Sequence, residues 1–388
     1  MRAALFRPVA VPSAARAYHD YYTAKSTKGG TLRLHLARAR QLVGVRSTRG
    51  TREYNEDRYR AVTLELPDAE YEGSPLKEAN RAYFGMFDGH GGSHVADWLA
   101  ANLHRRIESV TATDLPPTLS DLRDLGGYFR RFPAPPILAP LLETLRKEST
   151  MADKIELTLE QRLTLAYLRS DVDCMRSLQP GIIDGSTASV VIVEPKDGSP
   201  FWESDLLEVV VGHAGDSRII LCDVPTGLAI PLTTLDHHPG ATSEHERLRK
   251  YASFVTTDSW GDERILGTLQ ISRAVGDRRM KKFGVSAEPD VTSRTVTGAE
   301  AAFLVLVTDG VTSVMTNQEI VDIVKQHDDP TTAATKLVDA ADELGTEDNC
   351  TAMIVRLPGW GTPMPDLTKE LRKYRADNES TMASRQTW

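Results

Sequence analysis

The segment 86–92, which reads Met-Phe-Asp-Gly-His-Gly-Gly, constrains the fold of this chain more than any other stretch. It closes an alternating apolar run over 82–87 that stops abruptly at Asp88, as a buried strand does. Beyond the loop, apolar residues recur at helical spacing over 95–107. The pattern therefore predicts a strand, a glycine-rich loop and a helix, with an aspartate and a histidine at the mouth of the strand.

Two interpretations of this loop stay open when it is viewed alone. Glycines let the backbone approach a bound ion closely, and the carbonyl oxygen of Gly89 is a suitable ligand for a hard cation. The same residues also fit an Asp-Gly turn that carries a solvated histidine.

Acidic residues recur at the ends of other apolar runs, and this favours the first interpretation. They are Glu56 and Asp57, Asp216 within Gly-Asp-Ser-Arg, Asp309 after the run 302–307, and Asp348 before the run 350–355. Aspartate is depleted in strands, so its repeated placement at strand ends needs a cause, and a shared metal site supplies one. Any single one of these aspartates could also form a turn or cap a helix.

Seven motifs give the chain a resemblance to a known family. They are Gly50-Thr51-Arg52 with Glu56-Asp57, Asp88-Gly89-His90-Gly91-Gly92, Gly185-Ser186-Thr187-Ala188, Gly215-Asp216-Ser217-Arg218, Ser272-Arg273-Ala274-Val275-Gly276-Asp277, Asp309-Gly310 and Asp348-Asn349. In this order they resemble the metal-dependent serine/threonine protein phosphatases of type 2C, the PPM family, and among them the fungal mitochondrial members. The resemblance covers about residues 45–357.

The expected fold class is α+β. Short strands separated by turns, with few helices between groups of strands, favour antiparallel layers over alternating βαβ units. The resemblance implies a central sandwich of two antiparallel β-sheets flanked by α-helices, with the metal site at one edge. We expect one phosphatase domain over 40–358, an insertion near 111–140 and a C-terminal tail over 359–388.

The resemblance also implies a role for each acidic residue. Asp88 would bridge two metal ions, the Gly89 carbonyl, Asp309 and Asp348 would be direct ligands, Glu56 and Asp57 would hold metal-bound waters, and Asp216 would hold a third ion with Asp309. Oxygen ligands without a cysteine or histidine cluster suit Mn²⁺ or Mg²⁺. Because Ser313 stands where many relatives carry a further aspartate, we expect two firmly bound ions and a weak or absent third.

The implied reaction is hydrolysis of phosphoserine and phosphothreonine in proteins. A hydroxide activated by two metal ions would attack phosphorus directly, without a phosphoenzyme. Arg52 is the candidate phosphate clamp, although it could also pair with Glu53 or Glu56. His90 is the candidate general acid, although it could also be a solvated or supporting histidine.

The same motifs also allow a structural role for some residues and two alternative functions. Arg273 and Asp277 are interpreted as a structural ion pair with each other. A catalytically weak relative that serves as a binding scaffold is the alternative function, and the intact Arg52, Asp88 and His90 argue against it. A two-metal nuclease is a third possibility, which the order of the seven motifs disfavours.

Charge, apolar runs and cysteine spacing argue against nucleic-acid binding, a membrane span and a disulfide or zinc framework. The net charge of −8 argues against nonspecific nucleic-acid binding. No apolar run approaches the roughly 18 residues that span a bilayer. The three cysteines are widely separated and fit neither a zinc site nor a disulfide framework, so we expect them to be reduced and buried.

The first 30 residues differ in composition from the rest. Arg2, Arg7 and Arg16 lie among apolar residues, and no acidic residue precedes Asp20. This pattern is typical of a mitochondrial transit peptide; the alternative is a disordered tail on a cytoplasmic protein. A mitochondrial location would make phosphoproteins such as the pyruvate dehydrogenase complex candidate substrates.

Periodicity predicts further elements between the motifs. Helices are expected over 158–177, 243–251, 316–326 and 331–344. The runs 206–211 and 218–222 are expected to form an antiparallel hairpin with Asp216 in its turn.

Overall fold

A computed structural model describes most of the chain. The described residues are 21–25, 30–66, 81–126, 134–147, 155–179, 181–251, 253–258, 261 and 263–383. The arginines of the predicted targeting segment, at 2, 7 and 16, lie outside them.

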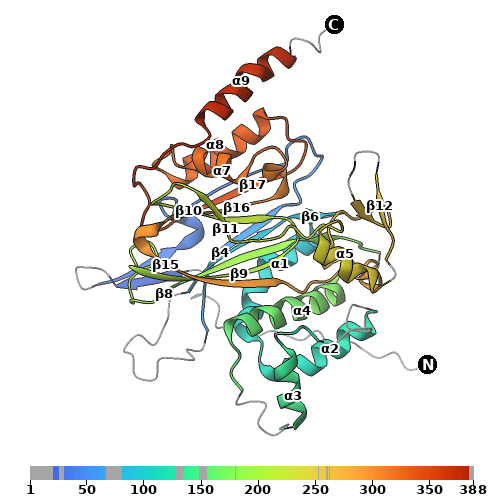
Figure 1. Cartoon of the computed structure of the whole chain (residues 1–388). Helices are drawn as coiled ribbons and strands as arrows, with labels where there is room; N and C mark the ends of the chain where they lie inside the picture. The colour runs from blue at the N-terminus through green and yellow to red at the C-terminus, as the bar shows by residue number, and fades with distance from the viewer. Residues whose placement is uncertain are drawn as a thin grey trace.

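Two five-stranded antiparallel sheets form the centre of the molecule (Figure 1). The first has the order β15-β9-β8-β5-β4, with bounds Asp290–Thr297, Leu206–Ala214, Ala188–Pro195, Arg81–Phe87 and Arg58–Leu64. The second has the order β11-β10-β16-β17-β3, with bounds Ala229–Pro231, Arg218–Asp223, Ala301–Val307, Cys350–Arg356 and Val43–Thr48. The predicted antiparallel sandwich is confirmed.

Three small pairings of strands accompany the sandwich. They are β1 (Tyr21–Lys25) with β2 (Thr31–His35), β12 (Val255–Thr257) with β13 (Glu263–Ile265), and β14 (Val275–Gly276) with β7 (Gly185–Ser186) and β6 (Gly89–His90). The last of these joins three sequence motifs, because β7 pairs with Gly89 and His90 on one side and with Val275 and Gly276 on the other.

Alternating side chains on the central strands divide the core into layers. In β5, Phe84 and Met86 face the second sheet, whereas Tyr83 and Phe87 pack in the cluster that contains α1 and α4. Since side chains on a strand alternate between its two faces, a strand that is buried on both sides reads as a continuous apolar run. This explains why the apolar run of β5 has no polar face.

Helices cover the outer faces of both sheets (Figure 1). α1 (His94–Ser109) and α4 (Leu159–Ser177) pack on the first sheet, and α7 (Asn317–Val324) and α8 (Pro330–Glu343) pack on the second. The remaining helices are α2 (Leu115–Asp124), α3 (Ala139–Lys147), α5 (Thr242–Arg249), α6 (Asp309–Thr312) and α9 (Lys369–Ala383). Within the described ranges, no helix has both the length and the apolar character needed to cross a lipid bilayer.

Capping residues set the starts of the predicted helices. Thr158 begins α4 and Thr316 begins α7, each with a side-chain oxygen that accepts a backbone N–H of the first turn. Asp329 and Pro330 begin α8 in the same way. The four helices predicted from periodicity are therefore present, each to within two residues at either end.

The predicted hairpin around Asp216 is wrong. β9 and β10 do not pair, because β9 belongs to the first sheet and β10 to the second. The turn that carries Asp216 therefore crosses from one sheet to the other. Both strands are buried on both faces, so their alternation could not indicate which partner each strand has.

The stretches expected as an insertion and as a tail contain helices. Leu115, Leu119 and Leu122 of α2 pack in the same apolar cluster as α1, while Phe129 and Phe132 lie outside the described residues. In α9 the apolar Leu371 is exposed, and Arg375 anchors the helix to Glu319 through an ion pair of 2.7 Å. Because charge pairs rather than an apolar stripe hold α9, its sequence shows no helical periodicity.

Candidate metal centre and active site

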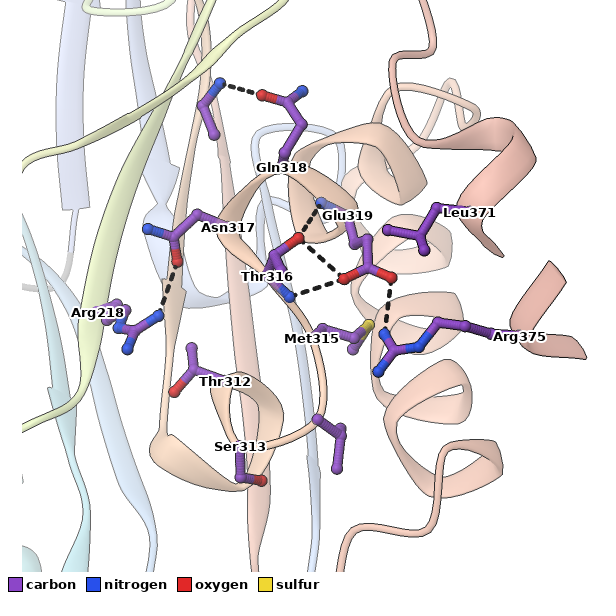
Figure 2. Close-up of a pocket in the computed structure, with 12 residues that line it drawn as sticks. Arg218, Thr312, Ser313, Met315, Thr316, Asn317, Gln318, Glu319, Leu371 and Arg375 are labelled. Carbon is purple, nitrogen blue, oxygen red and sulfur yellow. Dashed lines mark hydrogen bonds and ion pairs between the residues drawn. The ribbon is translucent and has the colours of Figure 1, made fainter. Parts of the chain in front are cut away.

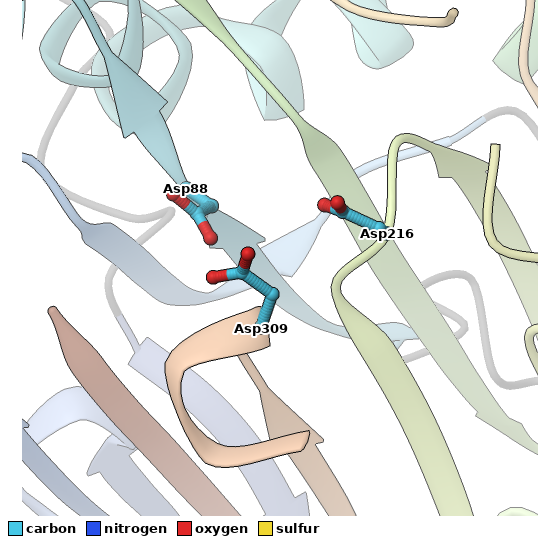
Figure 3. A group of neighbouring side chains, drawn as sticks. All are labelled: Asp88, Asp216 and Asp309. Carbon is cyan, nitrogen blue, oxygen red and sulfur yellow. The ribbon is translucent and has the colours of Figure 1, made fainter. Parts of the chain in front are cut away.

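Three aspartates from both sheets meet at one edge of the sandwich. Asp88 directly follows β5, Asp309 begins α6 after one intervening residue beyond the end of β16, and Asp216 lies in the turn between β9 and β10. One carboxylate oxygen of each lies within 4.8 Å of the others, and Figure 3 shows the side chains converging from three separate chain segments. The structure thus brings together three of the residues expected from sequence to hold metal ions.

The carboxylates destabilise one another's charged form. Burial and the negative charges of Asp309, Asp57 and Asp216 raise the pKa of Asp88 well above its ordinary value. Burial and Asp309 likewise raise the pKa of Asp216. A divalent cation between these groups would relieve the repulsion, so the cluster is suited to a cation rather than to an anion.

The donor set fits a hard cation. All three side chains offer only oxygen, which Mg²⁺ and Mn²⁺ prefer. Next to them, Asp57 is buried, and its Oδ1 atom has no hydrogen-bond partner among the described residues. A buried carboxylate oxygen without a partner is costly, and water held by a nearby ion would satisfy it.

Two glycines allow the acidic loops to approach one another. A Cβ atom at Gly89 would lie 2.6 Å from the backbone oxygen of Glu56, and one at Gly310 would lie 2.1 Å from that of Asn349. Both contacts are too short for a side chain, so the Asp-Gly pairs at 88–89 and 309–310 are required by the packing of the loops.

Thr187 fixes the backbone of Asp88. Its Oγ1 accepts the Asp88 N–H at 3.1 Å, and its own N–H donates to the Asp88 carbonyl at 2.9 Å. The same hydroxyl lies 3.0 Å from the hydroxyl of Ser217, the neighbour of Asp216. Sequence analysis singled out this Gly-Ser-Thr-Ala motif but assigned it no role; the contacts give Thr187 a positioning role for two of the three aspartates.

Two threonines hold Asp57. Oδ2 of Asp57 accepts hydrogen bonds from the hydroxyls of Thr308 at 3.0 Å and Thr351 at 2.6 Å. Thr308 directly precedes Asp309 and Thr351 lies in β17, so Asp57 is tied to the second sheet. Glu56 is half-buried beside it, and the Glu56 N–H donates to Oδ1 of Asn349 at 2.8 Å.

Asp348 lies beside the three-aspartate cluster but is not one of its members. Its Oδ2 atom pairs with the guanidinium of Arg52 at 2.7 Å, and its Oδ1 atom accepts the N–H of Asn349. The Arg52 side chain is 59% exposed, so much of its guanidinium remains open to solvent. Arg52 therefore pairs with Asp348 and not with Glu53 or Glu56, the two alternatives considered from the sequence.

His90 has a partner that sequence analysis missed. Its Nε2 atom lies 2.8 Å from Oδ2 of Asp277. Burial alone would lower the pKa of His90, but the charge and hydrogen bond of Asp277 raise it overall. The interpretation of Asp277 as the partner of Arg273 is therefore wrong, since Arg273 pairs with Glu244 and Asp290.

Sequence analysis also missed two histidines near Asp216. His237 accepts the N–H of Gly215 at 3.1 Å, and its own backbone N–H donates to the Gly215 carbonyl at 2.8 Å. His238 Nε2 lies 3.8 Å from Oδ2 of Asp216. The signal available in the sequence was the Asp-His-His-Pro run at 236–239, which periodicity leaves unassigned.

An open pocket of about 730 Å³ lies next to this site, between α6, α7 and α9. Figure 2 shows Arg218 and Arg375 on its walls, each bonded to a neighbouring side chain. None of the three clustered aspartates lines this pocket. Ser313 does line it, and its hydroxyl donates to the carbonyl of Gly310 at 3.1 Å.

Comparison with known proteins identifies relatives of the chain. The family model described as Protein phosphatase 2C matches residues 134–350. The chain is 33% identical over 364 residues to Protein phosphatase 2C homolog 4 of Schizosaccharomyces pombe, which is 92% of this chain and 90% of that protein. It is 31% identical over 337 residues to the mitochondrial Protein phosphatase 1K of Xenopus laevis, which is 87% of this chain and 73% of that protein.

Solved structures agree on the fold. A phosphatase from a pathogenic strain of Toxoplasma gondii superposes with a TM-score of 0.60 at 19% identity, over 88% of this chain and 94% of that one. The serine-threonine phosphatase 2C of Toxoplasma gondii gives a TM-score of 0.55 at 22% identity, over 81% and 94%. At these identities the likeness establishes the fold alone.

Proposed function

The chain belongs to the protein phosphatase 2C family and is a protein serine/threonine phosphatase, and from this premise we propose that Asp88, Asp216 and Asp309 form its metal centre. The single observation that carries the proposal is the convergence of these carboxylates to within 4.8 Å at the strand ends. The fitting cation is Mn²⁺ or Mg²⁺. When bound, such ions supply the positive charge that activates water and draws electron density from phosphoryl oxygens.

The side chains around the cluster divide the remaining work. Asp57 and Glu56 orient water at the centre, and Asp348 adds negative charge next to Asp309. Arg52 binds phosphoryl oxygens through the exposed part of its guanidinium. His90 is the general acid: its Nε2–H donates a hydrogen bond to Asp277, so Nδ1 is the atom that delivers a proton to the departing serine or threonine oxygen.

The metal-centre proposal is tested with a phosphothreonine peptide and a divalent cation. We expect hydrolysis with Mn²⁺ and none with EDTA, and near-complete loss in Asp88→Asn and in Asp309→Asn with the fold retained. Asp124→Asn, at the exposed end of α2, is the matched control and should keep its activity. Near-normal Mn²⁺-dependent turnover in Asp88→Asn or in Asp309→Asn would contradict the assignment of the metal centre.

The same geometry supports two strong ion sites and a weak third. Ser313 is neutral, and its hydroxyl is already bonded to Gly310, so Asp216 and Asp309 supply the only carboxylates that we assign to a third ion. We expect Ser313→Asp to lower the Mn²⁺ concentration needed for half-maximal activity. An unchanged or higher requirement would contradict this reading.

A mitochondrial location is the second part of the proposal. It rests on the acid-poor, arginine-bearing start of the chain, and on the mitochondrial designation of one relative. Phosphoproteins of that compartment, such as the pyruvate dehydrogenase complex, are the corresponding substrate candidates. A fluorescent protein fused to residues 1–30 should enter mitochondria, whereas a diffuse cytosolic signal would reject the assignment.

A further inference from the structure

A tight turn beside His90 carries two exposed arginines. The carbonyl of Asp277 accepts the N–H of Met280 at 2.7 Å, so Arg278 and Arg279 occupy the two central positions of the turn. Both side chains are exposed, and neither has a hydrogen-bond or ion-pair partner within the described part of the chain. Lys282 follows on the same surface, exposed, with Nζ 4.8 Å from the centroid of the Phe283 ring.

A buried ion pair fixes the base of this turn. Asp171 of α4 accepts the N–H of Gly276 through Oδ1 at 2.9 Å, and its Oδ2 atom pairs with the ammonium of Lys281 at 2.9 Å. Both charged side chains are almost fully buried. Burying such a pair costs desolvation energy that the pair barely recovers, so its contribution lies in holding both ends of the turn on one rigid helix.

The turn is also strained at the residue that touches the active site. Asp277 has a φ of +47°, a left-handed conformation that a non-glycine residue seldom adopts. Its side chain reaches His90 at 2.8 Å, while the next two residues project into solvent. Strain of this kind persists where the surroundings impose it, and it gathers at functional sites. The turn thus holds the two arginines at a fixed position close to His90.

We propose that Arg278 and Arg279, assisted by Lys282, bind an anionic side chain of the substrate that lies close in sequence to the phosphorylated serine or threonine. The inference rests on the proposed function and names the substrate class: phosphoproteins whose flanking residues are acidic or carry a second phosphate. Guanidinium groups match both carboxylate and phosphate oxygens. The clamped turn lowers the entropy lost on binding, because its backbone is already ordered.

The test compares peptides rather than proteins. Three phosphothreonine peptides of equal length carry glutamates on both sides of the target residue, a second phosphothreonine on one side, or glutamines on both sides. We measure kcat/KM on each for the full chain, for Arg278→Ala/Arg279→Ala and for Arg105→Ala/Arg294→Ala, with p-nitrophenyl phosphate as a substrate without flanks. The last variant removes the same charge from exposed positions on α1 and β15.

The unmodified enzyme should favour the glutamate and doubly phosphorylated peptides over the glutamine peptide. Loss of both arginines should reduce that preference by roughly three- to tenfold, mainly through KM, since exposed ion pairs are individually weak. Activity on p-nitrophenyl phosphate and on the glutamine peptide should stay within about twofold, and the preference should shrink as salt screens the charges. The control variant should keep the preference.

Two outcomes overturn the inference, and they differ from failure of the proposed function. Equal kcat/KM on all three peptides in the unmodified enzyme would contradict the inference. A preference for the anionic peptides that survives in Arg278→Ala/Arg279→Ala would also contradict it. A preference for only one of the two anionic peptides would identify the group that is bound. Absence of Mn²⁺-dependent hydrolysis of every substrate would instead reject the proposed function.

Discussion

At the scale of single residues, the hydroxyl of Thr187 links two of the clustered aspartates. It accepts the N–H of Asp88 and contacts Ser217, which adjoins Asp216. A carboxylate that must hold an ion needs a fixed backbone, because misplacing a ligand by even about 1 Å can cost roughly a hundredfold in rate. Thr187 thus acts on the site without offering it a ligand.

Replacement of Thr187 by valine tests this positioning role. Thr187→Val keeps the shape of the side chain but leaves the partly buried N–H of Asp88 without this acceptor, which costs about 1–3 kcal/mol. We expect kcat/KM to fall roughly tenfold, as about 1.4 kcal/mol in a barrier produces, and the Mn²⁺ requirement to rise. Thr187→Ser retains the hydroxyl and should restore both values; a serine variant as impaired as the valine variant would argue against the hydroxyl.

The His90–Asp277 contact leads to a second prediction at this scale. Burial lowers the pKa of His90, but the charge and hydrogen bond of Asp277 outweigh burial and raise it, which favours the protonated form that a general acid requires. His90→Ala should slow phosphopeptide hydrolysis by roughly 10²–10⁴-fold, and hydrolysis of p-nitrophenyl phosphate much less, because nitrophenolate departs without a proton.

The matched control for that experiment is His94→Ala. His94 also contacts an aspartate, Asp184, at 2.7 Å, but its side chain is 63% exposed. The His94→Ala variant should leave the ratio of phosphopeptide to p-nitrophenyl phosphate hydrolysis unchanged. Equal losses on both substrates in His90→Ala would speak against proton donation.

At the scale of elements, a pair of stacked histidines braces the turn between the two sheets. The rings of His213 and His237 lie 4.8 Å apart. His213 Nε2 donates to the carbonyl of Leu235 and its Nδ1 accepts from Ser189, while His237 holds both backbone groups of Gly215. The contacts made by the ring nitrogens require neutral imidazoles. The stability of the turn that carries Asp216 therefore depends on pH.

The sign of that dependence follows from the burial of His213. Burial and the neighbouring His237 lower the pKa of His213 to about 3, whereas an unfolded histidine titrates near 6.5. The contribution to stability is complete above about pH 6.5 and is lost as the pH falls towards 3, by up to about 1.4 kcal/mol per pH unit. Urea unfolding between pH 7.5 and 5 should show this loss, and His213→Gln should make the slope shallower by about that amount. An identical slope in the variant would contradict the assignment.

Sequence patterns predicted the elements better than their partners. The apolar run before Asp88 and the helical spacing after it gave β5 and α1, because both signals are local. The partners of β9 and β10 were mispredicted, since strands buried on both faces carry no mark of which sheet they join. The same limit applies in the site: the acids stand at predictable strand ends, but the Asp277–His90 contact joins residues 187 positions apart.

At the scale of the whole molecule, the sandwich brings its two sheets to a common edge. β5 and β9 of the first sheet and β16 of the second end there, and one of the clustered aspartates follows each strand within two residues. The apolar layer between the sheets fixes how far apart these ends lie. The separation of the carboxylates is therefore a property of the packed core and not of any one loop.

The most direct test of this account is a calorimetric titration of the full chain with Mn²⁺, alongside Asp309→Asn. The account predicts two tightly bound ions in the unmodified protein and markedly weaker binding in the variant, because Asp309 is one of the three carboxylates that meet within 4.8 Å. Three tight ions in the unmodified protein would contradict the predicted weakness of the third site. A variant that titrates like the unmodified protein would show that the ions bind elsewhere and would contradict the central claim.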